Sequence, residues 1–228
     1  MKLSIIIPAY NEEATIAAVI GRVAKLKYKK EIIVVNDGST DKTRYKILDT
    51  RYKQIKLINK KINEGKGAAI RDALKVVTGD VVIIQDADLE YDPNDYKLLL
   101  KPILDGKAQV VFGSRFITSA PRRALYFWHW VGNAFLTLLT DAITNLNLTD
   151  METCYKAFTA QVARKLDIKE TRFGFEPEFT VKIAKMKVPV YEVGVSYSGR
   201  SYEEGKKIGW RDGVWAIWSL IKYGVLDI

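Results

Sequence analysis

Val81-Val82-Ile83-Ile84, followed by Gln85-Asp86-Ala87-Asp88-Leu89-Glu90, is the stretch of sequence that decides the fold. Its four apolar residues have the length and the β-branched composition of a buried strand. Parallel α/β sheets bind ligands at the carboxyl ends of their strands, where these acidic residues stand. Carboxylate, water and phosphate oxygens are the ligands that Mg²⁺ and Mn²⁺ prefer. The stretch therefore predicts a metal site for a diphosphate, although a solvated acidic turn would have the same composition.

Strands and helices are expected to alternate around this stretch in the first half of the chain. The expected strands are Leu3–Ile7, Ile32–Val35, Ile55–Ile58, Val81–Ile84 and Val110–Phe112. The expected helices are Ala14–Leu26, Thr43–Thr50, Gly67–Val77 and Asp95–Leu104, with Asp41 as the N-cap of the second. This alternation predicts an α/β fold with a mainly parallel sheet and right-handed crossovers.

After Phe116 the pattern changes to longer helical stretches. We expect helices at Pro121–Leu148 (interrupted near Asp141–Thr144), Pro177–Met186 and about Ile208–Tyr223, with an extended segment at Val188–Tyr197. No repeat or linker divides the chain, and its 228 residues suit one domain. We expect residues 1–116 to bind a nucleotide and residues 117–228 to bind a second substrate.

Charge and cysteine content narrow the classes of function. A net charge of +9 suits a polyanionic ligand, an anionic membrane face or nucleic acid. No basic run has the form of a nucleic-acid-binding motif, so we expect no nucleic acid partner. The single cysteine, Cys154, indicates a reducing compartment. The chain starts directly with a strand, and its longest apolar region, Ala124–Leu139, is too short to span a bilayer, so we expect a cytoplasmic protein.

Two further kinds of turn follow the predicted strands. Pro8-Ala9-Tyr10-Asn11-Glu12 and Asn36-Asp37-Gly38-Ser39-Thr40-Asp41 place polar side chains where a nucleotide would lie, although the second is also good turn chemistry. Asn63-Glu64-Gly65-Lys66-Gly67-Ala68-Ala69 opens a helix whose N-terminus favours an anion. The glycine-rich patterns of Rossmann oxidoreductases and of P-loops are both absent.

In this order the motifs resemble those of the GT-A family of inverting glycosyltransferases, in the branch with dolichyl-phosphate mannose synthase and bacterial polyprenyl-phosphate glycosyltransferases. Segments that also match are Gly113-Ser114-Arg115-Phe116, Phe173-Gly174-Phe175-Glu176, Gly199-Arg200 and Glu204-Gly205-Lys206-Lys207. The resemblance implies a Rossmann-like GT-A fold. It also implies metal-dependent transfer of mannose or glucose, with inversion, from a donor of the GDP-mannose or UDP-glucose class to a polyprenyl or dolichyl phosphate.

The resemblance also implies roles for individual residues. Those that would hold the nucleotide sugar are Pro8, Tyr10, Glu12, Asp37, Lys66 and Asp86. Those that would bind Mg²⁺ or Mn²⁺ are Asp86, Asp88 and Glu90, the last at a position where mannose synthases commonly carry Gln. Those that would clamp the acceptor phosphate are Arg115, Arg200 and Lys206, and the catalytic residues would be Asp88 and Arg115.

The chemistry of the acceptor separates two hypotheses. A polyprenyl phosphate is already anionic and needs neutralising cations rather than a base. A soluble glycan or protein acceptor would need a carboxylate base, for which the candidates are Asp150, Glu176 and Glu178. His129 lies in an aromatic run, and Cys154 has no second histidine to pair with, so neither indicates a nucleophilic dyad. A sugar nucleotidylyltransferase would have a glycine-rich turn after the first strand, which this chain lacks.

An aromatic segment, Tyr126-Phe127-Trp128-His129-Trp130, lies beside Arg122 and Arg123 and is followed by further Phe and Leu residues. This composition suits a helix in a membrane interface, and Trp210, Trp215, Trp218 and Tyr223 would extend its surface. A buried core helix or a contact between copies of the chain, as in a homo-oligomer, would have the same composition. We expect peripheral attachment to the cytoplasmic face of a membrane.

Overall fold

The computed structural model describes residues 1–50, 52, 55–118, 123–124, 126–201, 203 and 210–226, and only the backbone of residues 210 and 211. The strands are β1 (Leu3–Ala9), β2 (Lys30–Asn36), β3 (Ile55–Asn59), β4 (Val81–Ile84), β5 (Val110–Ser114), β6 (Lys156–Thr159) and β7 (Val190–Gly194). The helices are α1 (Ile16–Lys25), α2 (Thr43–Asp49), α3 (Lys66–Leu74), α4 (Tyr96–Leu104), α5 (Phe127–Thr144), α6 (Ala160–Lys165), α7 (Phe175–Lys185) and α8 (Trp210–Gly224). A short 3-10 helix, η1 (Pro93–Asp95), precedes α4.

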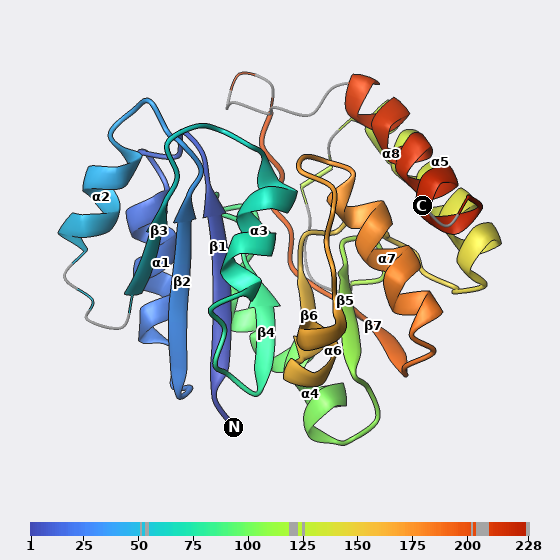
Figure 1. The fold of residues 1–228 in the computed structure, drawn as a ribbon, viewed down its shortest axis with the longest axis horizontal. Helices are drawn as coiled ribbons and strands as arrows, with labels where there is room; N and C mark the ends of the chain where they lie inside the picture. The colour runs from blue at the N-terminus through green and yellow to red at the C-terminus, as the bar shows by residue number, and fades with distance from the viewer. Residues whose placement is uncertain are drawn as a thin grey trace.

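The strands form one seven-stranded sheet in the order β3-β2-β1-β4-β6-β5-β7. β1 to β4 are parallel to their neighbours in this set, and β5 is parallel to β7. β6 runs antiparallel between β4 and β5. The predicted α/β fold with a mainly parallel sheet is therefore confirmed. In Figure 1 the carboxyl ends of β1 to β4 lie at the upper edge of the sheet.

Helices cover both faces of this sheet because alternate strand residues point to opposite sides. On one face Ile5 and Ile7 pack with the α1 residues Ile16, Val19, Ile20 and Val23, whose spacing is that of one helix face. On the other face Ile6 packs in a second cluster with α3 and with Phe175 and Phe179 of α7. β4 is buried on both faces, as its unbroken apolar sequence predicts.

Several predicted boundaries need correction. Asp41 is not the N-cap residue of α2, which is Lys42, although Asp41 Oδ1 does accept from Thr43 N at 2.9 Å. α5 runs unbroken through Asp141 and stops at Thr144, where Asn145 adopts a left-handed conformation with φ 56°, so the predicted break lies at the end of its range and the helix does not resume toward Leu148. The predicted start of the last helix at Ile208 lies outside the described residues.

Two elements were not predicted, the strand β6 and the helix α6 that follows it. β6 has four residues, and its Lys156 is fully buried with its ammonium group 5.2 Å from the Phe112 ring centroid. A short segment that begins with lysine has no strand signature of its own. Its place between β4 and β5 depends on pairing with strands more than forty residues away.

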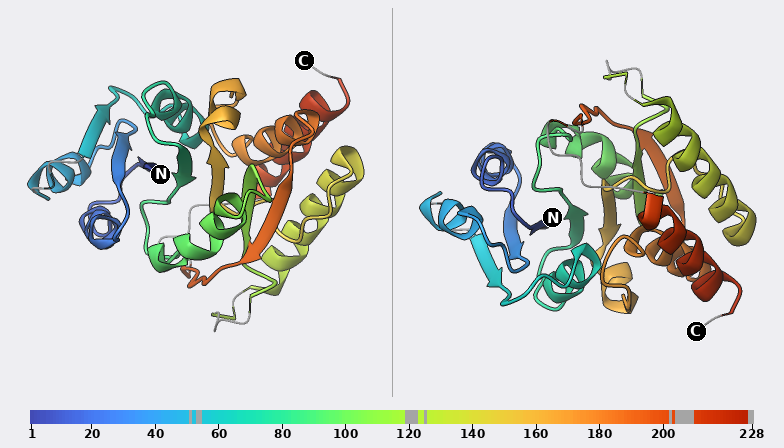
Figure 2. Two further views of the ribbon diagram at one scale, coloured as in Figure 1. Left: turned by 90° about the horizontal axis from the view of Figure 1, so that it is seen from below. Right: turned by 90° about the horizontal axis from the view of Figure 1, so that it is seen from above.

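α5 and α8 lie side by side at the end of the sheet far from α2, and both pack against α7 (Figures 1 and 2). Their inner residues, such as Leu139 and Leu220, form a small apolar cluster with Val181 of α7. Their outward residues are also apolar and include Trp128, which is 77% exposed, and Trp215, which is 59% exposed. Within the described ranges, none of the helices combines the length and the apolarity that crossing a bilayer requires.

Candidate active site

The loops that follow β1 and β2 interlock at the carboxyl edge of the sheet. The Asn11 backbone N–H donates to Ser39 Oγ at 3.0 Å, and Thr40 N donates to Asn11 Oδ1 at 2.9 Å. Glu12 N donates to Thr43 Oγ1 at 2.8 Å. These bonds bring the two predicted nucleotide-binding turns together, as expected from parallel neighbouring strands.

Asp37, predicted to contact the nucleoside, is a structural partner of the turn before α3. Asp37 Oδ2 accepts from Gly65 N at 2.6 Å, and Oδ1 accepts from Glu64 N at 3.2 Å. Lys60 Nζ also lies 3.1 Å from Asp37 Oδ1. The carboxylate therefore fixes the turn that carries Lys66. Pro8, Tyr10 and Glu12, the other predicted nucleoside contacts, are half-buried at the same edge.

Glycines on both sides of Lys66 let its turn approach the loop before α7. Gly65 has φ 99°, and a Cβ at Gly67 would lie 2.3 Å from the carbonyl oxygen of Glu170. At this close approach Lys66 Nζ lies 3.0 Å from Asp86 Oδ1 and 3.0 Å from Glu176 Oε1. It also donates to Cys154 Sγ at 2.8 Å. We call Lys66, Asp86 and Glu176 the lysine corner.

A second cation, Arg200, pairs with the other acidic residues of the edge. Its Nη2 lies 2.9 Å from Asp88 Oδ2, and its Nε lies 3.2 Å from Glu90 Oε1. Its Nη1 lies 3.5 Å from Glu12 Oε2. We call these four residues the arginine corner. Asp86 and Asp88, two positions apart in the chain, thus pair with cations from different halves of the protein.

The two aspartates have opposite electrostatic environments. Burial alone would raise the pKa of Asp86, but the charge of Lys66 holds it below its usual range. Burial, together with the nearby charges of Asp86 and Glu90, raises the pKa of Asp88 to about 8. The guanidinium of Arg200 offsets this effect only in part. Negative charge is therefore in excess around Asp88.

The predicted metal ligands do not form a three-carboxylate cluster. Among the described residues, no group of three or more acidic, histidine or cysteine side chains is placed to hold one metal ion. Within the described part of the chain, Lys66 nevertheless pairs with two carboxylates and Arg200 with three, so negative charge outweighs positive charge among these residues. That excess fits a divalent cation held by one or two carboxylates and completed by diphosphate oxygens, as Mg²⁺ is commonly bound.

Arg115, predicted as a catalytic and phosphate-binding residue, lies at the end of β5 in a buried ion pair. Its Nε and Nη2 lie 2.7 Å from the two carboxylate oxygens of Asp150. Asn133 of α5 bonds to both partners, at 3.2 Å in each case. The guanidinium carbon of Arg115 also lies 5.2 Å from the ring centroid of Tyr197. Arg115 is thus held rigidly, with α5 and the segment after β7 as its neighbours.

The three candidate bases are all engaged by other groups. Asp150 is fully buried and accepts both bonds from Arg115. Glu178 is fully buried and accepts from the backbone N–H groups of Lys169 and Glu170, at 2.7 and 2.8 Å. Glu176 pairs with Lys66 through one oxygen, and its buried Oε2 has no hydrogen-bond partner among the described residues. Asp150 and Glu178 therefore have both oxygens engaged, whereas Glu176 keeps one buried oxygen beside the Lys66 ion pair.

Lys206, a predicted phosphate ligand, lies outside the described residues. Two residues of the site, Cys154 and Tyr197, were not predicted from the sequence. The antiparallel direction of β6 brings the segment before it to the carboxyl edge, where Cys154 meets Lys66. Tyr197 was also missed, and its hydroxyl donates to Glu90 Oε2 at 2.9 Å. No sequence signal marks Cys154, since its role in the site depends on the direction of β6. Tyr197 lies three residues before Arg200, and that proximity is the one available signal.

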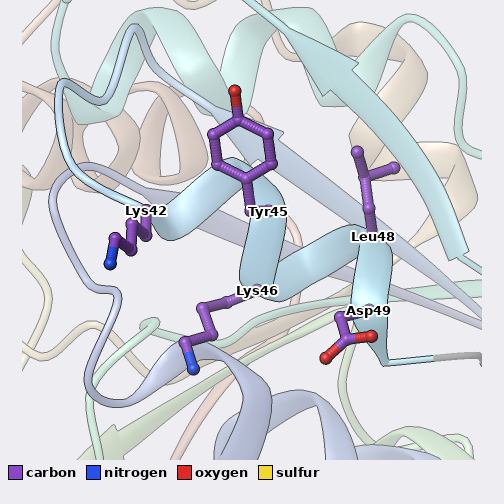
Figure 3. Close-up of a pocket in the computed structure, with 5 residues that line it drawn as sticks. All are labelled: Lys42, Tyr45, Lys46, Leu48 and Asp49. Carbon is purple, nitrogen blue, oxygen red and sulfur yellow. The ribbon is translucent and has the colours of Figure 1, made fainter.

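A surface hollow of about 530 Å³ lies along α2 and is not part of this site. It is lined by Lys42, Tyr45, Lys46, Leu48 and Asp49 (Figure 3). All of these residues come from one short stretch of chain, and none belongs to either corner. The hollow therefore brings no side chains together from different elements.

Comparisons with known proteins agree with this geometry. The sequence profile described as "Glycosyl transferase family 2" matches residues 4–167. The chain is 27% identical over 225 residues to an undecaprenyl-phosphate mannosyltransferase of Micrococcus luteus, covering 92% of this chain and 88% of that one. It is 29% identical over 215 residues to a dolichyl-phosphate beta-glucosyltransferase of Trichomonas vaginalis, covering 86% of this chain but 65% of the longer relative.

Among solved structures, glucosyl-3-phosphoglycerate synthase from Mycobacterium tuberculosis, in complex with Mn²⁺, uridine diphosphate and phosphoglyceric acid, has a similar fold. The TM-score is 0.76 at 20% sequence identity, and the match covers 98% of this chain and 78% of that one. At this identity the likeness concerns the fold. Sheet, acidic edge and family profile agree, and the chain is a glycosyltransferase of the GT-A fold that belongs to glycosyl transferase family 2.

Proposed function

We propose that the protein transfers a hexose from a nucleotide diphosphate sugar to the phosphate of a polyprenyl phosphate, with inversion at the anomeric carbon. The observation that carries the proposal is the state of the three candidate bases: Asp150 and Glu178 have both oxygens engaged, and Glu176 is buried and paired with Lys66 through one oxygen. A phosphate nucleophile needs no base, because it is already ionised at neutral pH. Relatives named for undecaprenyl and dolichyl phosphate support the same choice.

The two corners divide the work of the reaction in this proposal. Lys66 lies on the donor side and neutralises the diphosphate together with the N-terminus of α3. Mg²⁺ or Mn²⁺, held by Asp86 and Asp88, would stabilise the negative charge that develops on the leaving diphosphate. Arg200 and Arg115, with Lys206, bind the acceptor phosphate and aim one of its oxygens at the anomeric carbon.

We also propose that the outward apolar face of α5 and α8 lies on an anionic membrane surface. Trp128, Phe135 and Leu138 follow one another at helical spacing and are 77%, 55% and 68% exposed. Trp215 and Trp218 continue this face on α8, whereas Tyr223 is buried and does not belong to it. The exposure of these residues in the single chain supports a surface role for this face rather than the buried-helix alternative. The net charge of +9 favours anionic lipid.

Product analysis tests the reaction. The protein is incubated with radiolabelled GDP- and UDP-sugars and undecaprenyl phosphate, and the product is extracted into organic solvent. We expect label in the organic phase with one donor, and loss of that label in excess EDTA. A parallel arm offers phosphoglyceric acid, the molecule bound in the Mycobacterium tuberculosis structure. Label that appears in that soluble acceptor, and never in the organic phase, would favour the soluble-acceptor hypothesis.

Vesicle sedimentation tests the membrane surface. Binding to anionic vesicles is expected to weaken with salt without vanishing, because salt screens charge and not apolar insertion. Replacing Trp128 and Trp130 with serine should reduce both binding and lipid-linked product. The matched control replaces Tyr45 and Leu48, which are 69% and 59% exposed on α2 at the far end of the sheet. If the wild type does not sediment with vesicles and forms a dimer that the Trp128 and Trp130 replacements disrupt, the face is a contact between copies of the chain instead.

A further inference from the structure

Glu90 connects the acidic edge to the segment that carries Arg200. This segment, residues 196–200, follows β7, and we call it the strap. The Ser198 backbone N–H donates to the Glu90 carbonyl oxygen at 2.9 Å. The Tyr197 hydroxyl donates to Glu90 Oε2 at 2.9 Å, and the Arg200 backbone N–H donates to Glu90 Oε1 at 2.8 Å. Glu90 thus accepts from three residues of a segment that lies about 110 residues away.

The same carboxylate also fixes the side chain of Arg200. Arg200 Nε donates to Glu90 Oε1 at 3.2 Å, in addition to the backbone bond. With Tyr197 on its other oxygen, the carboxylate accepts bonds from both sides. Tyr197 in turn packs under Arg115, at 5.2 Å from guanidinium carbon to ring centroid. The two arginines of the acceptor side are therefore joined through Tyr197 and Glu90.

This arrangement accounts for a carboxylate at position 90. A carboxylate accepts hydrogen bonds at both oxygens, whereas a glutamine accepts at one and presents N–H donors at the other. Glutamine could still accept from Arg200, but it would turn its amide nitrogen toward the Tyr197 hydroxyl. The Tyr197 hydroxyl and Arg200 can therefore both donate to side-chain oxygens of residue 90 only when that residue is glutamate.

We propose that Glu90 is a positioning residue. Its carboxylate holds the strap so that the Arg200 guanidinium stays beside Asp88, where it would bind the acceptor phosphate next to the donor. In this proposal the cation is left to Asp86 and Asp88, and Glu90 acts through Arg200 and Tyr197. The inference rests on the proposed function in taking Arg200 as an acceptor-phosphate ligand. The hydrogen bonds between Glu90 and the strap stand independently of it.

Three measurements on four variants test this role: Glu90→Ala, Glu90→Gln, Tyr197→Phe and the control Tyr191→Phe. Tyr191 lies on β7 and is 43% exposed, so its hydroxyl is a matched control away from both corners. The measurements are hydrogen exchange of the Ser198 to Arg200 amides in the free protein, binding of Mn²⁺ alone, and the KM for undecaprenyl phosphate and for the donor.

In Glu90→Ala, the Arg200 amide should exchange at least about tenfold faster, while the Kd for Mn²⁺ changes less than about threefold. The KM for undecaprenyl phosphate should rise about tenfold or more, the factor expected for one hydrogen bond to a charged group, and the donor KM should stay nearly constant. Tyr197→Phe should show a smaller rise in the same KM. Glu90→Gln should recover part of the loss, and Tyr191→Phe should match the wild type.

Unchanged exchange of the Arg200 amide in Glu90→Ala, or a loss of Mn²⁺ affinity of tenfold or more, would overturn the proposal and make Glu90 a metal ligand. If undecaprenyl phosphate is no substrate at all, the proposed function fails. The exchange and Mn²⁺ measurements still decide whether Glu90 holds the strap, so the two failures are distinguishable.

Discussion

Two buried carboxylates at opposite edges of the sheet have opposite environments. Glu31, at the amino edge, is 5% exposed and accepts bonds from Ser4 Oγ at 2.5 Å and from Thr78 N at 2.6 Å. Lys56 Nζ lies 2.6 Å from its second oxygen. Asp88, at the carboxyl edge, is 8% exposed, and its partners among the described residues are one backbone N–H and one guanidinium.

Their pKa values differ accordingly. Burial alone would raise the pKa of Glu31, but its bonds to Lys56, Ser4 and Thr78 hold it at about 2. Burial and the neighbouring carboxylates raise the pKa of Asp88 to about 8. The amino edge is therefore arranged for stability, whereas the carboxyl edge holds unfavourable charge that a cationic ligand would relieve. Such local conflicts are expected where a protein binds its substrates.

The largest expected effect is on catalysis, in Asp88→Ala. We expect turnover to fall by at least about a thousandfold, because the variant loses a carboxylate that would hold the divalent cation against the leaving diphosphate. The melting temperature should not fall, since the removed charge is unfavourable in the folded protein. Turnover and thermal unfolding are measured on the same preparation. Full activity of this variant, or full activity of the wild type in excess EDTA, would contradict the metal assignment.

The matched change at the amino edge, Glu31→Gln, should have the reverse profile. We expect a loss of roughly 3 kcal/mol in the free energy of unfolding at pH 7, the equivalent of a pKa lowered from 4.5 to about 2. Because the folded pKa is depressed, this stabilisation is present above about pH 4 and disappears as the pH falls toward 2. Denaturant unfolding at pH 7 and at pH 3 measures it. Turnover is measured at a temperature at which the Glu31→Gln variant stays folded. A large loss of turnover under these conditions would show that the amino edge also takes part in catalysis.

Removing the cation of the arginine corner should have a smaller and more selective effect. In Arg200→Ala we expect the KM for the acceptor phosphate to rise about ten- to a hundredfold, and the donor KM to change little. Steady-state kinetics with each substrate varied in turn separates the two. If donor affinity collapses while acceptor saturation is unchanged, Arg200 belongs to the donor side.

A further expected effect, on stability alone, is its pH dependence in metal-free protein. The folded pKa of Asp88 is raised, so the folded state binds more protons than the unfolded state between about pH 4 and pH 8, and stability falls as the pH rises through this window. Asp88→Asn cannot ionise at that position. Its melting temperature, measured in EDTA, should therefore gain on the wild type from pH 5 to pH 8. A constant difference would mean that Asp88 carries no such excess charge.

The sequence by itself determined the repeating part of the fold. β1 to β5 lie where apolar β-branched runs predict them, because burial of alternate or continuous apolar residues is a local property of a strand. It also determined that Asp86 and Asp88 stand at the carboxyl edge, since they directly follow β4. Family membership follows from the same ordered motifs.

Only the tertiary structure decided which groups meet at that edge. The pairing of Asp86 with Lys66, and of Asp88 with Arg200, joins residues from turns that are remote in the chain. The antiparallel β6 brings Cys154 to the same edge, and no pattern in a four-residue strand specifies its direction. Local sequence sets the periodicity of each element, whereas side-chain partners depend on strand order and register, which are set by contacts between distant segments.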